Sequence, residues 1–200
     1  MDQAFDNYSW LNPSQTYRIS GDEVFFATKP GTDYWQRTHY GFRRDNGHQF
    51  AFLTSREAFI YGLKTRYTPH TEYDQAGVMV YIDPDNWCKA SIEFENEAVS
   101  RLGSVVTNSG FSDWATTDIQ TQPKVEIFYR LSRQGKDFLL EQSSDDHIYH
   151  QMRIFHLMNA DSAIRVGMYA CSPQQSSFEV RFSQIRFGAC TWPLVHASEE

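Results

Sequence analysis

Cysteine is scarce in this sequence of 200 residues and follows no pairing pattern. The three cysteines, Cys88, Cys171 and Cys190, are widely spaced, and no Cys-x-x-Cys motif occurs. An odd, dispersed set of this kind predicts neither a disulfide framework nor a zinc site. We expect Cys171 to lie in the core, because unpaired cysteine is among the most often buried residue types.

Metal-binding motifs are missing as well. The seven histidines form no His-x-His or His-Glu-x-x-His pattern. The stretch Asp83-Pro84-Asp85-Asn86 has oxygen ligands, but it lacks the glycine and the downstream glutamate of an EF-hand loop. Turn formation explains this stretch, and we expect neither a metal nor a cofactor.

Long apolar runs and clusters of positive charge are also absent. No window approaches 18 apolar residues, and the start, MDQAFDNYSW, lacks the basic and apolar regions of a secretory signal. The sequence therefore predicts a cytoplasmic protein without a membrane anchor. The net charge is −7 and the longest basic run is Arg43-Arg44, which disfavours nucleic acid and anionic membrane as partners.

Aromatic residues, in contrast, are abundant. The chain has 15 Phe, 11 Tyr and 5 Trp, a composition that favours β-structure. No linker or internal repeat divides it, so we expect a single domain over residues 1–200. Short alternating runs separated by turns predict an all-β sandwich of two antiparallel sheets. The length exceeds that of an immunoglobulin domain and favours a jelly roll.

The clearest patterns are two hairpins. In residues 73–95 most of the aliphatic side chains share one parity, namely Ala76, Val78, Val80, Ile82, Ala90 and Ile92. Lys89, Ser91 and Glu93 take the other parity, together with Met79 and Tyr81, which predicts a dry face and a mostly polar face. A second hairpin is expected over residues 124–146. A break in phase at Ser183-Gln184 predicts a β-bulge.

Two segments are less regular. Residues 111–123 predict a loop or a short edge strand ended by Pro123. Residues 148–158 are compatible with either a strand or a short helix.

Six stretches resemble the DUF1349 family of bacterial and fungal proteins, in the order in which that family has them. They are WLNP (10–13), GTDYWQRTHYGF (31–42), YDQAGVMVYIDPDNWCKASIEF (73–94), SVVTNSGFSDW (104–114), VGMYACSP (166–173) and FEVRFSQIRF (178–187). The resemblance covers nearly the whole chain and implies a concanavalin A-like jelly-roll sandwich with one concave sheet. It implies no particular reaction.

One candidate binding segment is TDYWQRTHYGF. Saccharides are bound by aromatic rings that cover C–H faces and by planar polar groups that bond to hydroxyls. If a strand continues through this segment, Trp35, Arg37 and His39 share one face. The sequence is equally compatible with an alternative in which Trp35 fills the core and Arg37 pairs with an acid.

Further candidates lie on the hairpin of residues 73–95 and in a later loop. They are Asp74, Gln75, Trp87, Lys89, Glu93, Asp113 and Trp114. Asp74 has an alternative role as a turn cap. The stripe that runs from Trp87 through Lys89 to Glu93 is either a binding surface or ordinary solvated exterior.

We prefer a non-enzymatic protein that binds a carbohydrate-like or other polar small ligand on its concave face. A first alternative is a glycoside hydrolase, because Glu93 and Glu95 occupy alternate positions of one strand, where paired carboxylates act in such enzymes. A second alternative is an interaction module that regulates a metabolic enzyme, because a yeast member of the family is named as a regulator of enolase.

Overall fold

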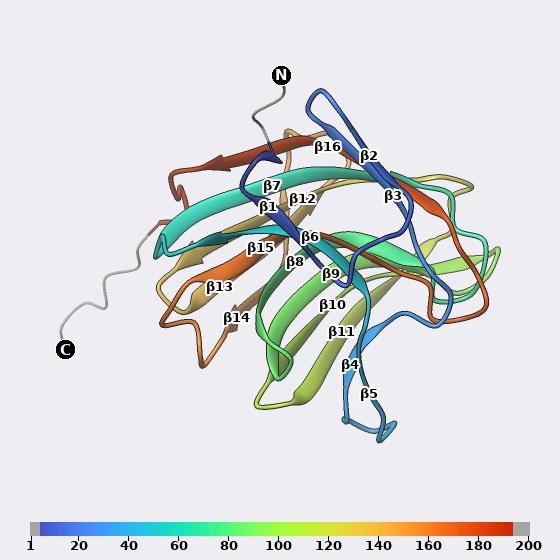
Figure 1. Cartoon of the computed structure of the whole chain (residues 1–200), viewed down its shortest axis with the longest axis horizontal. Helices are drawn as coiled ribbons and strands as arrows, with labels where there is room; N and C mark the ends of the chain where they lie inside the picture. The colour runs from blue at the N-terminus through green and yellow to red at the C-terminus, as the bar shows by residue number, and fades with distance from the viewer. Residues whose placement is uncertain (1–4, 194–200) are drawn as a thin grey trace.

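The computed structural model describes residues 5–193 and arranges most of them in two seven-stranded antiparallel sheets (Figure 1). Sheet A contains, in spatial order, β1 (Tyr8–Leu11), β6 (His48–Thr54), β15 (Ile164–Cys171), β8 (Gln75–Asp83), β9 (Asn86–Phe94), β10 (Val99–Asn108) and β11 (Phe111–Gln120). Sheet B contains β14 (His150–His156), β13 (Asp137–Ser143), β12 (Val125–Gln134), β7 (Ala58–Tyr67), β16 (Glu179–Gly188), β3 (Glu23–Ala27) and β2 (Tyr17–Ser20).

The main core lies between the two sheets. Ala76, Val78 and Val80 of β8 pack there with Tyr61 of β7 and Tyr129 of β12. These β8 residues have the parity that the alternating pattern assigned to the dry face, so that prediction is confirmed. Burial of such a large aromatic and aliphatic cluster is the main stabilising contribution to the sandwich.

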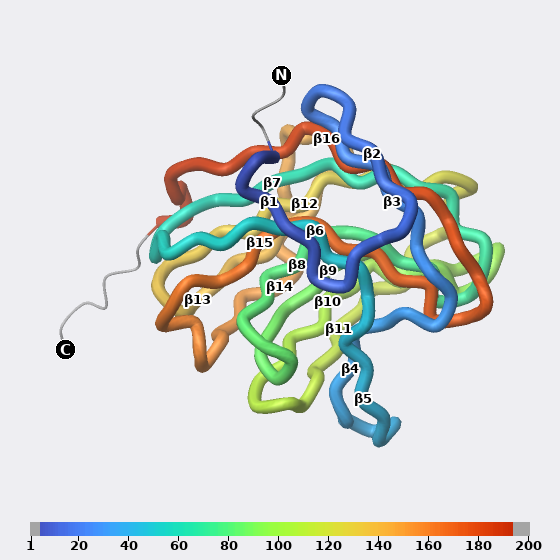
Figure 2. Tube along the Cα trace, in the orientation of Figure 1, coloured from blue at the N-terminus to red at the C-terminus, as the bar shows by residue number. Residues whose placement is uncertain are grey.

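A short third sheet, β4 (Tyr34–Gln36) and β5 (Arg43–Asp45), projects from the side of the sandwich (Figures 1 and 2). It packs against the face of sheet A that points away from sheet B. A second apolar cluster joins the two, and it includes Tyr34, Trp35, Met79, Trp87 and Tyr169. The segment around β4 and β5, residues 31–47, is called the flap here.

The predicted hairpins are confirmed. Strands β8 and β9 pair around a turn at Pro84-Asp85, with one register shift between Tyr81 and Asp83, and β12 and β13 pair around Gly135-Lys136. Gly135 has φ of 62°, a backbone conformation that glycine adopts without steric cost. The predicted bulge also occurs, because the pairing of β16 with β7 shifts between Ser183 and Arg186, and Gln184 has φ of 52°.

The two less regular segments are both strands. Residues His150–His156 form β14, at the edge of sheet B, which excludes the short helix. Residues Phe111–Gln120 form a ten-residue edge strand that pairs with β10 along its whole length, so the edge strand is confirmed, the loop is excluded, and only the expected short length was wrong. An exposed edge strand buries few side chains on either face, and this one therefore lacks the apolar alternation that marks a strand.

Candidate functional site

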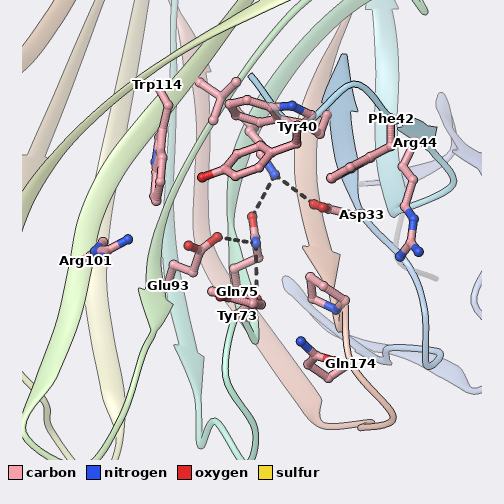
Figure 3. A pocket seen from close by; sticks show the side chains of 14 residues that line it. Asp33, Tyr40, Phe42, Arg44, Tyr73, Gln75, Glu93, Arg101, Trp114 and Gln174 are labelled. Carbon is pink, nitrogen blue, oxygen red and sulfur yellow. Dashed lines mark hydrogen bonds and ion pairs between the residues drawn. The ribbon is translucent and has the colours of Figure 1, made fainter. Parts of the chain in front are cut away.

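A cavity of about 390 Å³ lies between the flap and the outer face of sheet A (Figure 3). This volume is within the range of small-molecule binding sites. The residues that line it come from the flap, four strands of sheet A and two loops: Asp33, Trp35, Tyr40, Phe42, Arg44, Tyr73, Gln75, Lys89, Glu93, Arg101, Val105, Trp114, Pro173 and Gln174.

The floor of the cavity is a hydrogen-bonded polar network on β8 and β9. Gln75 lies opposite Glu93 in the strand register, and its amide Nε2 donates to Glu93 Oε2 at 2.6 Å. The Oε1 atom of Gln75 accepts from Lys89 Nζ at 2.9 Å and from the hydroxyl of Tyr169 at 3.2 Å. Side chains on alternate positions of neighbouring strands thus converge on one face, which is the polar face of the predicted hairpin.

Lys89 is almost fully buried, with 5% of its side chain exposed, and a carboxylate of the flap, that of Asp33, compensates its positive charge. Its Nζ lies 3.2 Å from Asp33 Oδ1. Burial acts to lower the pKa of Lys89, but the charge of Asp33, with smaller contributions from Cys171 and Glu93, raises the pKa above its ordinary value. Lys89 therefore keeps its positive charge, and the ion pair ties the flap to the sheet.

For Glu93, the effect of burial on the pKa outweighs the effect of the neighbouring charge. Burial raises the pKa of Glu93 from 4.5 to about 7, and the positive charge of Lys89 only partly opposes that rise. Near neutral pH the carboxyl group is therefore divided between its protonated and ionised forms. It can donate a hydrogen bond as well as accept one, which a carboxylate with an ordinary pKa cannot do.

Aromatic rings form the walls. Trp35 lies edge-on to Tyr40 at 5.4 Å and to Trp114 at 6.5 Å between ring centroids. Tyr40 is 57% exposed and Phe42 is 41% exposed. Rings fixed by packing on one side and open on the other provide flat apolar surface at little entropic cost.

Arginines mark two ends of the cavity. In Figure 3, Arg101 lies beside Trp114 on one side, and Arg44 lies beyond Phe42 on the other. The guanidinium of Arg101 stacks 5.3 Å from the Trp114 ring and pairs with Glu95 at 3.0 Å.

Some of the residues predicted from the sequence line this cavity. Trp35, Gln75, Lys89, Glu93 and Trp114 do so. The structure thus brings the flap, the β8–β9 hairpin and β11 together around one space.

The other predicted residues lie elsewhere. Trp87 is fully buried in the second apolar cluster, with its indole N–H donating to the carbonyl of Pro84, so no ligand can reach it. Asp74 is also fully buried and accepts from the backbone N–H groups of His70 and Thr71, which is the role of a turn cap. Both residues are structural, and their assignment to a binding surface is corrected.

Arg37, His39 and Asp113 do not line the cavity either. Strand β4 ends at Gln36, and Arg37 and His39 have φ of 56° and 62°, so the expected alternation with Trp35 does not occur. Arg37 donates to the carbonyl of Gly110 and lies 3.8 Å from Asp85. Asp113 forms an ion pair with Arg153 of β14.

The carboxylate pair of the hydrolase interpretation is divided. Glu93 lines the cavity, whereas Glu95 lies outside its lining and pairs with Arg101. Within residues 5–193 no group of histidine, cysteine, aspartate and glutamate side chains could hold a metal ion. In the same part of the chain, no helix is long and apolar enough to cross a membrane.

Sequence reasoning missed several lining residues. They are Asp33, Tyr40, Phe42, Arg44, Tyr73, Arg101, Val105, Pro173 and Gln174. Tyr40 and Phe42 lie in the aromatic segment that was singled out, so its composition was the available signal. Arg101 and Gln174 carry no local signal, because they reach the cavity only through sheet pairing and loop packing.

Comparison with known proteins agrees with this architecture. The family described as "Protein of unknown function (DUF1349)" matches residues 10–190. Regulation of enolase protein 1 of Saccharomyces cerevisiae is 32% identical over 176 residues, which is 88% of this chain and 86% of the yeast protein.

Two solved structures show the same fold. A functionally unknown protein from Saccharomyces cerevisiae superimposes with a TM-score of 0.85 and 31% identity, covering 96% of this chain and 99% of that chain. The carbohydrate binding module CBM66 from Bacillus subtilis has a TM-score of 0.61 at 8% identity, covering 93% of this chain and 98% of that one.

Proposed function

The chain belongs to the DUF1349 family, and we propose that it binds a carbohydrate or carbohydrate-like ligand in the cavity between the flap and sheet A, without transforming it. The observation that carries this proposal is the placement of aromatic walls around a polar floor. Tyr40 and Trp114 offer ring surface for the C–H groups of a sugar, and the buried Trp35, which is 8% exposed, packs edge-on to both of them. Glu93 and Gln75 offer hydrogen-bonding groups for its hydroxyls.

Binding without hydrolysis is favoured because the carboxylates are already engaged. Glycoside hydrolysis generally uses two carboxyl groups on either side of the scissile bond. Asp33, the other acid in the lining, is held by Lys89, and Glu95 is held by Arg101.

A thermal-shift screen with a library of neutral and acidic saccharides, followed by calorimetry, tests the proposal. We expect a ligand that raises the unfolding temperature of the natural protein, and Tyr40→Ala to weaken its binding about tenfold by removing an exposed wall of the cavity. Tyr17→Ala is the matched control, because Tyr17 is 53% exposed against 57% for Tyr40 but lies on β2 of the other sheet. Equal loss in the two variants, or no binding of any saccharide, contradicts the proposal.

A second candidate function is regulation of a metabolic enzyme through direct contact. It is supported by the identity of 32% to a yeast protein that is named for regulation of enolase. Mixing this protein with purified enolase and following co-elution and enolase activity provides the test. Separate elution together with unchanged activity rules this candidate out for enolase.

A further inference from the structure

Ion pairs compensate most of the charges in the cavity, and among the lining residues only Arg44 and Glu93 have no ion pair in the part of the chain that the structure describes. Lys89 pairs with Asp33, and Arg101 pairs with Glu95 and Asp118. Arg44 has no ion pair with any carboxylate in residues 5–193. Its one hydrogen bond there is a long one, from Nη1 to the carbonyl of Gly31 at 3.4 Å.

The position of Arg44 makes its charge available to a ligand. Arg44 lies on β5, is exposed, and has its guanidinium carbon 5.7 Å from the ring centre of Phe42. Figure 3 shows it at the edge of the cavity, with the side chain of Gln174 on a facing loop. The Gln174 amide also has no hydrogen-bond partner among the residues that the structure describes. A guanidinium without an ion pair and a side-chain amide without a hydrogen bond therefore border the same space.

This local positive charge differs from the rest of the protein. The whole chain has a net charge of −7, so its overall electrostatic field disfavours the approach of anions. The lining of the cavity contains three cations, Arg44, Lys89 and Arg101, and two acids, Asp33 and Glu93. After the ion pairs are taken into account, the charges left are those of Arg44 and of Glu93, and Glu93 is only partly ionised near neutral pH because its pKa is about 7.

We infer that the ligand of the cavity is a saccharide that carries an anionic group, a carboxylate or a phosphate, and that Arg44 binds this group. The inference rests on the proposed function, and it narrows the ligand to a chemical class. The planar fork of a guanidinium matches two oxygens of a carboxylate or phosphate, and such charge-assisted bonds are roughly twice as strong as neutral ones. The aromatic walls then cover the sugar ring, while Gln174 donates to an oxygen next to the anion.

Matched probes test the charge requirement. Calorimetry at low ionic strength compares digalacturonic acid with its dimethyl ester, which has the same rings and no charge, and a hexose phosphate with the free hexose. We expect the natural protein to prefer a charged probe over its neutral counterpart by about tenfold, the size of one charge-assisted bond. Preference for the uronate or for the phosphate identifies which source supplies the anion, and either result supports the inference.

Variants of Arg44 test whether this residue causes the preference for the charged probe over its neutral counterpart. Arg44→Gln should reduce it to less than about twofold, and Arg44→Lys should restore part of it, because a point charge lacks the fork. Arg18→Gln makes the same change in net charge on β2 of sheet B, where Arg18 lies 3.7 Å from Glu179, and should leave the preference unchanged. Arg44 is exposed, so we expect the unfolding temperature of Arg44→Gln to match that of the natural protein.

Different outcomes overturn different statements. If each neutral probe binds as tightly as its charged counterpart, the anionic inference is wrong and the proposed saccharide binding stands. The inference is also wrong if Arg44→Gln keeps the full preference for the charged probe. If no saccharide of either kind binds to the folded protein, the proposed function fails, and the inference fails with it.

Discussion

Replacement of Glu93 by glutamine should make the protein more stable at alkaline pH and leave it almost unchanged in acid. Burial raises the pKa of Glu93 from 4.5 to about 7 in the folded state. Between these two values the folded protein holds a proton on Glu93 that the unfolded chain has lost. The free energy of unfolding therefore falls as the pH rises through this window, and the full cost is present above about pH 7.

The size of the effect follows from the shift in pKa. At about 1.36 kcal/mol per pKa unit, the rise from 4.5 to about 7 corresponds to an upper limit of about 3 kcal/mol. Solvent reaches part of the Glu93 side chain, which reduces the expected gain from Glu93→Gln to about 1–2 kcal/mol at pH ~8. Glutamine keeps the same shape, and its carbonyl oxygen can still accept from Gln75 Nε2.

Urea unfolding at several pH values between about 5 and 8 measures this difference. Glu126→Gln is a control of opposite sign, because the hydrogen bond from Lys64 lowers the pKa of Glu126, so that its ionised form stabilises the folded state. This control should lose stability at neutral pH. A gain in Glu93→Gln that is the same at all pH values, or a loss at pH ~8, would refute the assignment of a destabilising buried carboxylate.

Three further results are expected. Trp87→Ala should lower the free energy of unfolding by about 3–5 kcal/mol in urea titration, because it leaves a cavity in the second apolar cluster. A change below about 1 kcal/mol would show that Trp87 is not packed there. Lys89→Met should lower the free energy of unfolding by about 3 kcal/mol, because it leaves Asp33 without its partner, and adding Asp33→Leu should recover most of this loss. If the losses of the two single variants add up in the double variant, the two residues are not coupled. Calorimetry should show digalacturonic acid binding more tightly as the pH falls from about 8 to about 6, because protonation of Glu93 removes a negative charge from the cavity; an unchanged pH dependence in Glu93→Gln would contradict this cause.

Local sequence pattern determined the sandwich and the two faces of its central hairpin. Side chains in a strand alternate between faces, so the parity of Val78 and Val80 against Lys89 and Glu93 is sufficient to separate core from polar surface. The turn at Pro84-Asp85 is also encoded locally, because proline presets φ and the side chain of Asp83 accepts from the backbone N–H of Asp85.

Only the tertiary structure decided which polar residues form the cavity. The flap folds over the outer face of sheet A, buries Trp87 and brings Asp33 to Lys89 across 56 positions of sequence. Contacts of that range leave no periodic mark in the sequence, since they depend on how strands pair and loops pack. The same composition of rings and charges was therefore compatible with a core or with a binding site until the position of the flap was known.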